Sequence, residues 1–171
     1  SNFFAWNPPF TTKVKVPNYV YETSKYINNT PSVTRILLLP RLDSSGADSY
    51  TWGFWSLDML PRLFTDRSVI SIQTDDSKNI KNLLSQSLYQ NNEKLFLKLA
   101  SIMGINKILW RNDILYSDKK TKEKSFLREK NNLDNFDGII LEKKIGSWSL
   151  YSISSRDPNR LFYIPDDFIY F

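Results

Sequence analysis

Apolar residues along this chain occur in short continuous runs that alternate with helix-spaced sets. The first clear run occupies residues 35–39, with the sequence RILLL, and a proline follows it directly. A continuous run of this length is typical of a strand that is covered on both faces of a sheet. Comparable apolar or β-branched runs occupy 68–73 and 105–110. The three runs together predict three central strands.

The segments between these strands carry apolar residues at helical spacing. In the clearest of them, Leu95, Leu99 and Ile102 share one face, and Gly104 follows as a natural helix stop. Strands that alternate with helices form a mostly parallel sheet with right-handed crossovers. The expected helices are 57–65, 77–89 and 92–103.

The two ends of the chain follow different patterns. Residues 138–153 contain two β runs that meet at Gly146, which predicts an antiparallel hairpin at the edge of the sheet. A last short strand is expected at 161–164. Residues 1–31 are rich in proline and aromatic residues, so we expect an irregular segment, with an edge strand near 11–16 and a short helix over 19–28.

One internal segment, 117–131, is highly charged and lacks an apolar period, which predicts a flexible loop. The expected fold class is therefore α/β. It has three layers, with a mostly parallel central sheet, flanking helices and a C-terminal antiparallel hairpin. We expect residues 1–171 to form a single domain of this kind.

Composition narrows the chemistry that this chain can perform. It contains neither cysteine nor histidine, so thiolate metal sites and Ser–His or Cys–His nucleophile systems are excluded. The net charge of +5 favours anionic partners in general, but 18 acidic residues are interspersed with the basic ones, and no nucleic-acid partner is predicted. No apolar window is long enough to span a membrane. We expect no cofactor, and no catalytic activity in this fragment.

The best candidate site is the aromatic loop that follows the first central strand. Sugar rings present apolar C–H faces that stack on aromatic side chains, and carboxylates accept hydrogen bonds from sugar hydroxyls. The loop therefore predicts a glycan site. The alternative is that its aromatic residues only pack the loop onto the sheet. The candidate ligand-binding residues are Tyr50, Trp52, Trp55, Asp48 and Asp58.

Two other functions remain open at this stage. A free-standing, carboxylate-dependent α/β hydrolase would use Asp43, Asp48 and Asp58, in its sharpest form to hold Mg²⁺ or Ca²⁺. The spacing of these aspartates is not that of an EF-hand loop, and we assign no metal ligand. A structural interaction domain is the third reading.

Several segments also resemble a known family. The chain is similar to the large polytopic membrane glycosyltransferases of the GT-C type, the relatives of the arabinofuranosyltransferases and of the YfhO-like bacterial membrane proteins. The resemblance covers about residues 30–155. It is carried by Arg35 to Pro40, by Tyr50-Thr51-Trp52-Gly53, by Asp58 and the stretch up to Asp66 to Ile70, by Leu99 to Trp110, and by Trp148 to Tyr151.

The resemblance implies a place and a role for this domain. In that family the pattern lies in the soluble part of the protein, outside the cytoplasm, after the transmembrane helices. It implies a soluble outer domain at the extracytoplasmic face of the membrane. Such a domain binds or positions a glycan or lipid-linked sugar acceptor, or braces the transmembrane part of the same polypeptide. No catalytic residue is carried over to this chain.

Overall fold

A five-stranded sheet forms the centre of the computed structural model, which describes residues 2–7, 10–33, 35–40, 48–56, 60–72, 80–115 and 119–154. β3 pairs in parallel with β6 on one side and with β7 on the other, while β9 is antiparallel to β7 and to β8. The strand order across the sheet is β6 (Ser68–Ser71), β3 (Arg35–Leu39), β7 (Lys107–Arg111), β9 (Trp148–Ile153) and β8 (Ile139–Ile145).

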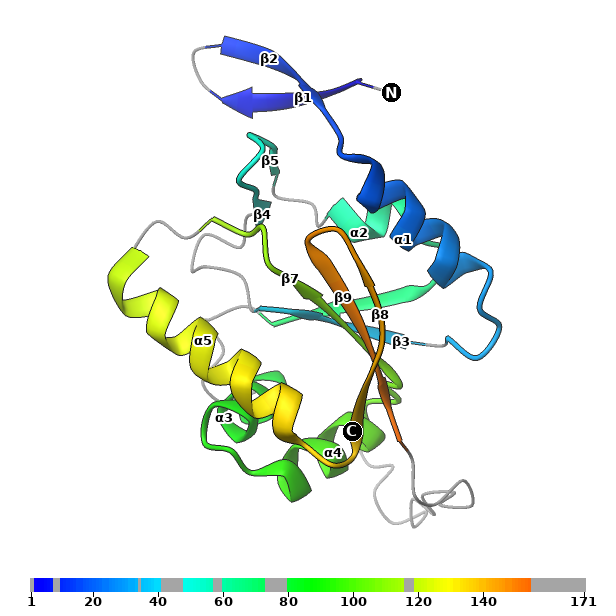
Figure 1. Cartoon of the computed structure of the whole chain (residues 1–171), viewed down its shortest axis with the longest axis vertical. Helices are drawn as coiled ribbons and strands as arrows, with labels where there is room; N and C mark the ends of the chain where they lie inside the picture. The colour runs from blue at the N-terminus through cyan, green and yellow to red at the C-terminus, as the bar shows by residue number, and fades with distance from the viewer. Residues whose placement is uncertain are drawn as a thin grey trace, which may run out of the picture.

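Helices cover both faces of this sheet, which makes three layers (Figure 1). β3 shows why its sequence is continuously apolar: Ile36 and Leu38 pack with one helical layer, Leu37 and Leu39 with the other. The expected fold class, including the hairpin at the edge of the sheet, is confirmed. One layer contains α1 (Asn18–Asn28) and α2 (Leu60–Phe64), and the other contains α3 (Ile80–Tyr89), α4 (Glu93–Ile102) and α5 (Lys119–Asn135).

Helix boundaries agree with the sequence signals where the ends are described. α4 begins after Asn92, whose side-chain oxygen accepts a hydrogen bond from the Leu95 amide at 3.1 Å. It ends before Gly104, which takes a positive φ of 65°. Within the described residues, no helix is both long and apolar enough to cross a membrane.

The prediction of a charged loop over 117–131 is wrong for the residues from 119 onward, because they belong to α5. Lysine, glutamate, leucine and arginine are good helix formers, so the composition suits a helix. The apolar period is hidden because polar residues occupy some of the buried positions of α5, including positions that face α3. One of them is Asn132, whose amide donates to the Leu88 carbonyl oxygen at 2.8 Å.

The N-terminal segment 1–31 is also more regular than predicted. It contains the expected helix, α1, and a hairpin of β1 (Asn2–Asn7) with β2 (Phe10–Lys15), which projects beyond the end of the sheet in Figure 1. Only the second of these strands was expected. The strand expected at 161–164 lies outside the described residues.

Gly146, at the turn between β8 and β9, is held against α1. A Cβ there would lie 2.6 Å from three side-chain carbons of Tyr19, and the residue has a φ of 55°. We expect Gly146→Ala to lower the free energy of unfolding by about 2 kcal/mol, as measured by urea denaturation. Gly53→Ala is the control, because Gly53 has a φ of 90° and a methyl group added there would meet no atom within 4 Å. A smaller effect at Gly146 than at Gly53 would contradict this steric account.

Candidate functional site

The aromatic loop forms a short hairpin that is fastened to the chain just after β7. β4 (Asp48–Ser49) pairs with β5 (Trp55–Ser56), and Gly53 permits the turn with its positive φ. The Thr51 amide donates to the backbone oxygen of Asp113 at 2.8 Å, and the Leu115 amide donates to the Ser49 oxygen at 2.7 Å. These backbone contacts fix the loop at the carboxyl end of a central strand.

Aromatic rings from three parts of the chain pack together beneath this hairpin. Trp52 stacks on Phe54 with ring centroids 5.5 Å apart, and Tyr50 lies 5.1 Å from Trp52. Trp148 of β9 lies 6.5 Å from Tyr50, and Tyr19 of α1 meets Trp148 edge to face at 5.9 Å. We call these five residues the aromatic cluster. The cluster joins the loop, α1 and β9.

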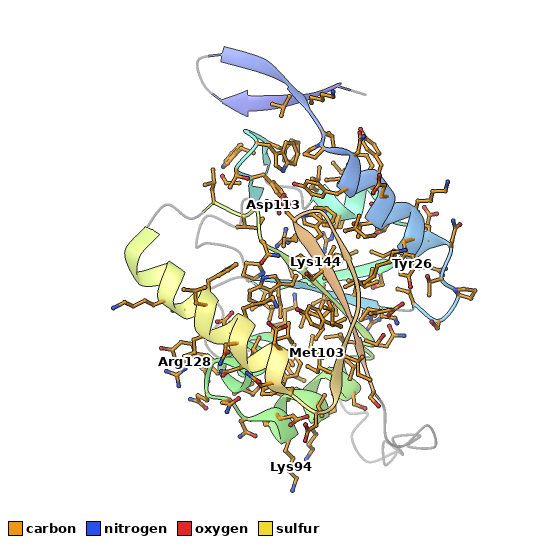
Figure 2. The ribbon with its side chains drawn as sticks, in the orientation of Figure 1. Tyr26, Lys94, Met103, Asp113, Arg128 and Lys144 are labelled. Atoms are coloured by element: carbon orange, nitrogen blue, oxygen red, sulfur yellow. The ribbon has the colours of Figure 1, made fainter. Side chains whose placement is uncertain are left out.

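Asp113 is the polar centre of the cluster, near the hairpin and just beyond β7 (Figure 2). It is 4% exposed, and its carboxylate accepts hydrogen bonds from Trp148 Nε1 at 2.9 Å, from Trp52 Nε1 at 3.0 Å and from the Tyr19 hydroxyl. Burial raises the pKa of Tyr19, and the hydrogen bond to Asp113 and the charge of that carboxylate raise it further. Tyr19 is therefore a neutral hydrogen-bond donor here.

Arg111 fastens the other side of the loop and is fully buried. Its guanidinium donates to the Tyr50 hydroxyl at 3.0 Å and to the backbone oxygen of Pro40 at 3.2 Å. The planar, permanently charged group has enough donors to serve several acceptors at once. It thereby connects the aromatic loop with the end of β3.

The structure places the predicted site residues at different depths. Tyr50 is 1% exposed, Trp52 is half-buried, and Trp55 is 37% exposed. The side chain of Asp48, and the whole of Asp58, lie outside the described part of the chain. Binding of a ligand by these residues stays a prediction, with Trp55 as the aromatic face that reaches solvent.

The arrangement suits recognition better than acid–base chemistry. The Asp113 carboxylate already accepts three hydrogen bonds, and the chain contains no histidine, the commonest general base. Among the described residues, no three acidic side chains gather to hold a metal ion. Asp43 and Asp58 lie outside those residues, so the metal-dependent alternative stays untested.

Sequence reasoning missed the two residues that organise this site, Arg111 and Asp113. A signal was present, because both are charged and directly follow the apolar run of β7. Side chains at the carboxyl ends of parallel strands converge on one edge of the sheet, where ligands of α/β proteins bind. Charged residues that end a buried strand therefore belonged among the candidates.

The fold and site together define a three-layer α/β domain that carries an aromatic hairpin at the carboxyl edge of its parallel strands. Solved structures of a much larger protein contain the same fold. A cryo-EM structure of the arabinofuranosyltransferase AftD from mycobacteria matches with a TM-score of 0.61 and 13% identity, over 84% of this chain. A mutant of the same protein matches with a TM-score of 0.63 and 14% identity, again over 84%.

The match covers only a small part of the larger protein. This chain spans 13% of the length of the AftD chains that it matches. The C-terminal globular domain of an oligosaccharyltransferase from Archaeoglobus fulgidus aligns over 81% of this chain, with a TM-score of 0.48 and 9% identity, too low to define a shared fold. No model of a known family and no curated protein matches the sequence. The resemblance inferred from the sequence is thus confirmed as a shared fold.

Proposed function

We propose that this chain is the extracytoplasmic domain of a membrane-bound, glycosyltransferase-like protein. Its role is to bind or position a glycan acceptor, or to brace the membrane part of the same polypeptide, without catalysing transfer itself. The observation that carries the proposal is the fold shared with a segment of an arabinofuranosyltransferase over 84% of this chain. The remainder of such a protein supplies the membrane part and the catalytic residues.

The aromatic hairpin supports the acceptor-binding role. Trp55 is 37% exposed, and Arg111 and Asp113 hold the hairpin that carries it through Tyr50 and Trp52. A rigid, partly exposed indole offers a flat apolar face at little entropic cost, and this face suits the C–H side of a sugar ring. The hairpin is therefore preorganised for stacking.

We expect arabinose-containing oligosaccharides to bind this chain saturably and to change its tryptophan fluorescence. Trp55→Ala should weaken that binding about tenfold, because the exposed stacking face is lost. Affinity is measured by isothermal titration calorimetry, which does not depend on the emission of the residue that is replaced.

Tyr89→Ala is the matched control for this experiment. Tyr89 is 39% exposed, close to the exposure of Trp55, but it lies on α3 in the opposite helical layer. Its replacement should leave oligosaccharide affinity unchanged. Absence of a saturable signal across arabinose, galactose and glucose oligosaccharides would remove the acceptor-binding role and leave the bracing role.

A further inference from the structure

A second concave region lies on the opposite face of the sheet from the aromatic cluster, between α5 and the β8–β9 hairpin. It has a volume of about 680 Å³. Pockets that bind small molecules commonly enclose about 300–1,000 Å³, so this one has room for a sugar residue and a neighbouring unit. The polar side chains that line it include Lys130, Asp134, Lys144 and Ser149.

The alternation of side chains along β9 explains why this hollow exists. Trp148 and Leu150 point toward α1 and fill that layer. On the α5 side the position between them is Ser149, which is too small to fill the space beneath the helix. Strand residues alternate between faces, so a large–small alternation leaves one face filled and the other hollow.

A fixed polar group forms the wall of the pocket on α5. The Lys130 ammonium donates to the Asp134 carboxylate at 2.6 Å and to the Tyr151 hydroxyl at 2.6 Å. The Tyr151 hydroxyl in turn donates to Asp134 at 2.6 Å. The Asp134 side chain remains 45% exposed, so its carboxylate still has acceptor capacity toward the pocket.

The opposite wall carries a second cation, Lys144 of β8. It pairs across the strands with Ser149, near the turn of the hairpin (Figure 2). Among the described residues, no carboxylate forms an ion pair with Lys144. The pocket therefore contains two ammonium groups and one carboxylate, Asp134, and so carries an excess positive charge that attracts anions.

Apolar surface completes the lining. Leu141 pairs with Tyr151 across the strands and is 51% exposed. A solvent-exposed leucine beside carboxylate, hydroxyl and ammonium groups suits a ligand with one apolar face and a polar rim. A sugar ring has this character, and an acidic substituent on it would meet the excess positive charge.

We propose that this pocket binds a sugar residue that bears an anionic group, either a carboxylate or a phosphate. The Lys144 ammonium holds the anion, the Asp134 carboxylate accepts a hydrogen bond from a ring hydroxyl, and Leu141 packs against the C–H face. The site shares no residue with the aromatic hairpin, so this proposal and the proposed function can fail independently.

The test is calorimetric titration of the chain at low ionic strength with galacturonate and with glucose-6-phosphate. Saturable binding of at least one of them is expected, and the one that binds identifies the anion. Neutral galactose should give no saturable signal. Lys144→Gln should weaken binding about tenfold or more, because a charge-assisted hydrogen bond is lost.

Lys143→Gln is the matched control, because it removes one positive charge, as Lys144→Gln does. Lys143 is the next residue on β8, but its ammonium points to the other face of the sheet and lies 4.3 Å from the centre of the Tyr26 ring on α1. This variant should bind the anionic sugar as the unaltered chain does. Equal weakening in the two variants would show a general charge effect and overturn the proposal.

Three further results would also overturn the proposal. The first is absence of saturable binding with both anionic sugars. The second is binding of galactose as tightly as galacturonate. The third is binding of inorganic phosphate as tightly as glucose-6-phosphate, which would show that the sugar ring contributes nothing.

Discussion

Replacing Asp113 with alanine is expected to lower the free energy of unfolding by about 4 kcal/mol. The substitution leaves three donors without their acceptor in a site that is almost closed to water. These donors are the Tyr19 hydroxyl and the indole N–H groups of Trp52 and Trp148. A buried donor without an acceptor lowers the free energy of unfolding by about 1–3 kcal/mol, and part of this loss is recovered where water reaches the half-buried groups. Urea denaturation followed by far-ultraviolet circular dichroism measures the loss.

Two variants give this experiment its controls. Asp113→Asn keeps one acceptor oxygen and should lose about half as much stability, since the indole groups of Trp52 and Trp148 donate to different oxygens and only one of them keeps its acceptor. Asp137→Ala removes an exposed aspartate from the turn before β8 and should change stability by less than about 0.5 kcal/mol. A loss below about 1 kcal/mol for Asp113→Ala would contradict the role of this carboxylate as the centre of the cluster.

A second buried charge joins β7 to the hairpin on the α1 side of the sheet. The Glu142 carboxylate accepts hydrogen bonds from Lys107, from the Ser152 hydroxyl, and from the Tyr26 hydroxyl at 2.8 Å. The side chains of Lys107 and Glu142 are 9% and 20% exposed. Among the described residues, Glu142 is the one carboxylate that pairs with Lys107 of the central strand β7.

Glu142→Gln is expected to cost about 3 kcal/mol at pH 7, because it leaves the Lys107 ammonium buried without a charged partner. Burial acts to raise the pKa of Glu142, but the three hydrogen bonds and the charge of Lys107 outweigh it, and the pKa lies below its ordinary value. A lowered pKa means that the carboxylate stabilises the fold above the unfolded-state pKa. This stabilisation is lost as the pH falls through the folded-state pKa.

The difference in stability between the unaltered chain and Glu142→Gln should therefore shrink as the pH falls below about 4. Urea denaturation at several pH values measures it. Glu22→Gln, at an exposed position of α1, should change stability by less than about 0.5 kcal/mol at pH 7. A stability difference that is the same at neutral and acidic pH would exclude an ionised Glu142 as the source of the effect.

The strands of this fold could be predicted because burial on both faces leaves a direct mark on the sequence. β3 has the same bounds in the structure as in the prediction, and β6 and β7 lie within about two residues of it. α5 was not predicted, because burial left no such mark on its sequence. Its inward face carries Glu129 and Asn132, so burial there left no apolar period.

Only part of the candidate site could be predicted from the sequence. The aromatic loop could be located because Tyr50, Trp52 and Trp55 crowd into a few positions. The hydrogen-bond partners of its anchor Asp113 could not be predicted, because they come from positions that are 94, 61 and 35 residues away along the chain. Only the folded sheet brings these positions together.

The open edge of β8 affects how copies of this chain associate at high concentration. Within the described residues no strand pairs with that side, and an open strand edge is a template on which another molecule can add a strand. The pairing irregularity between Leu141 and Lys143 interrupts the template midway, and two adjacent lysines place positive charge along it. A second copy would have to bring its own lysines against these, so repulsion opposes growth of the sheet into fibrils.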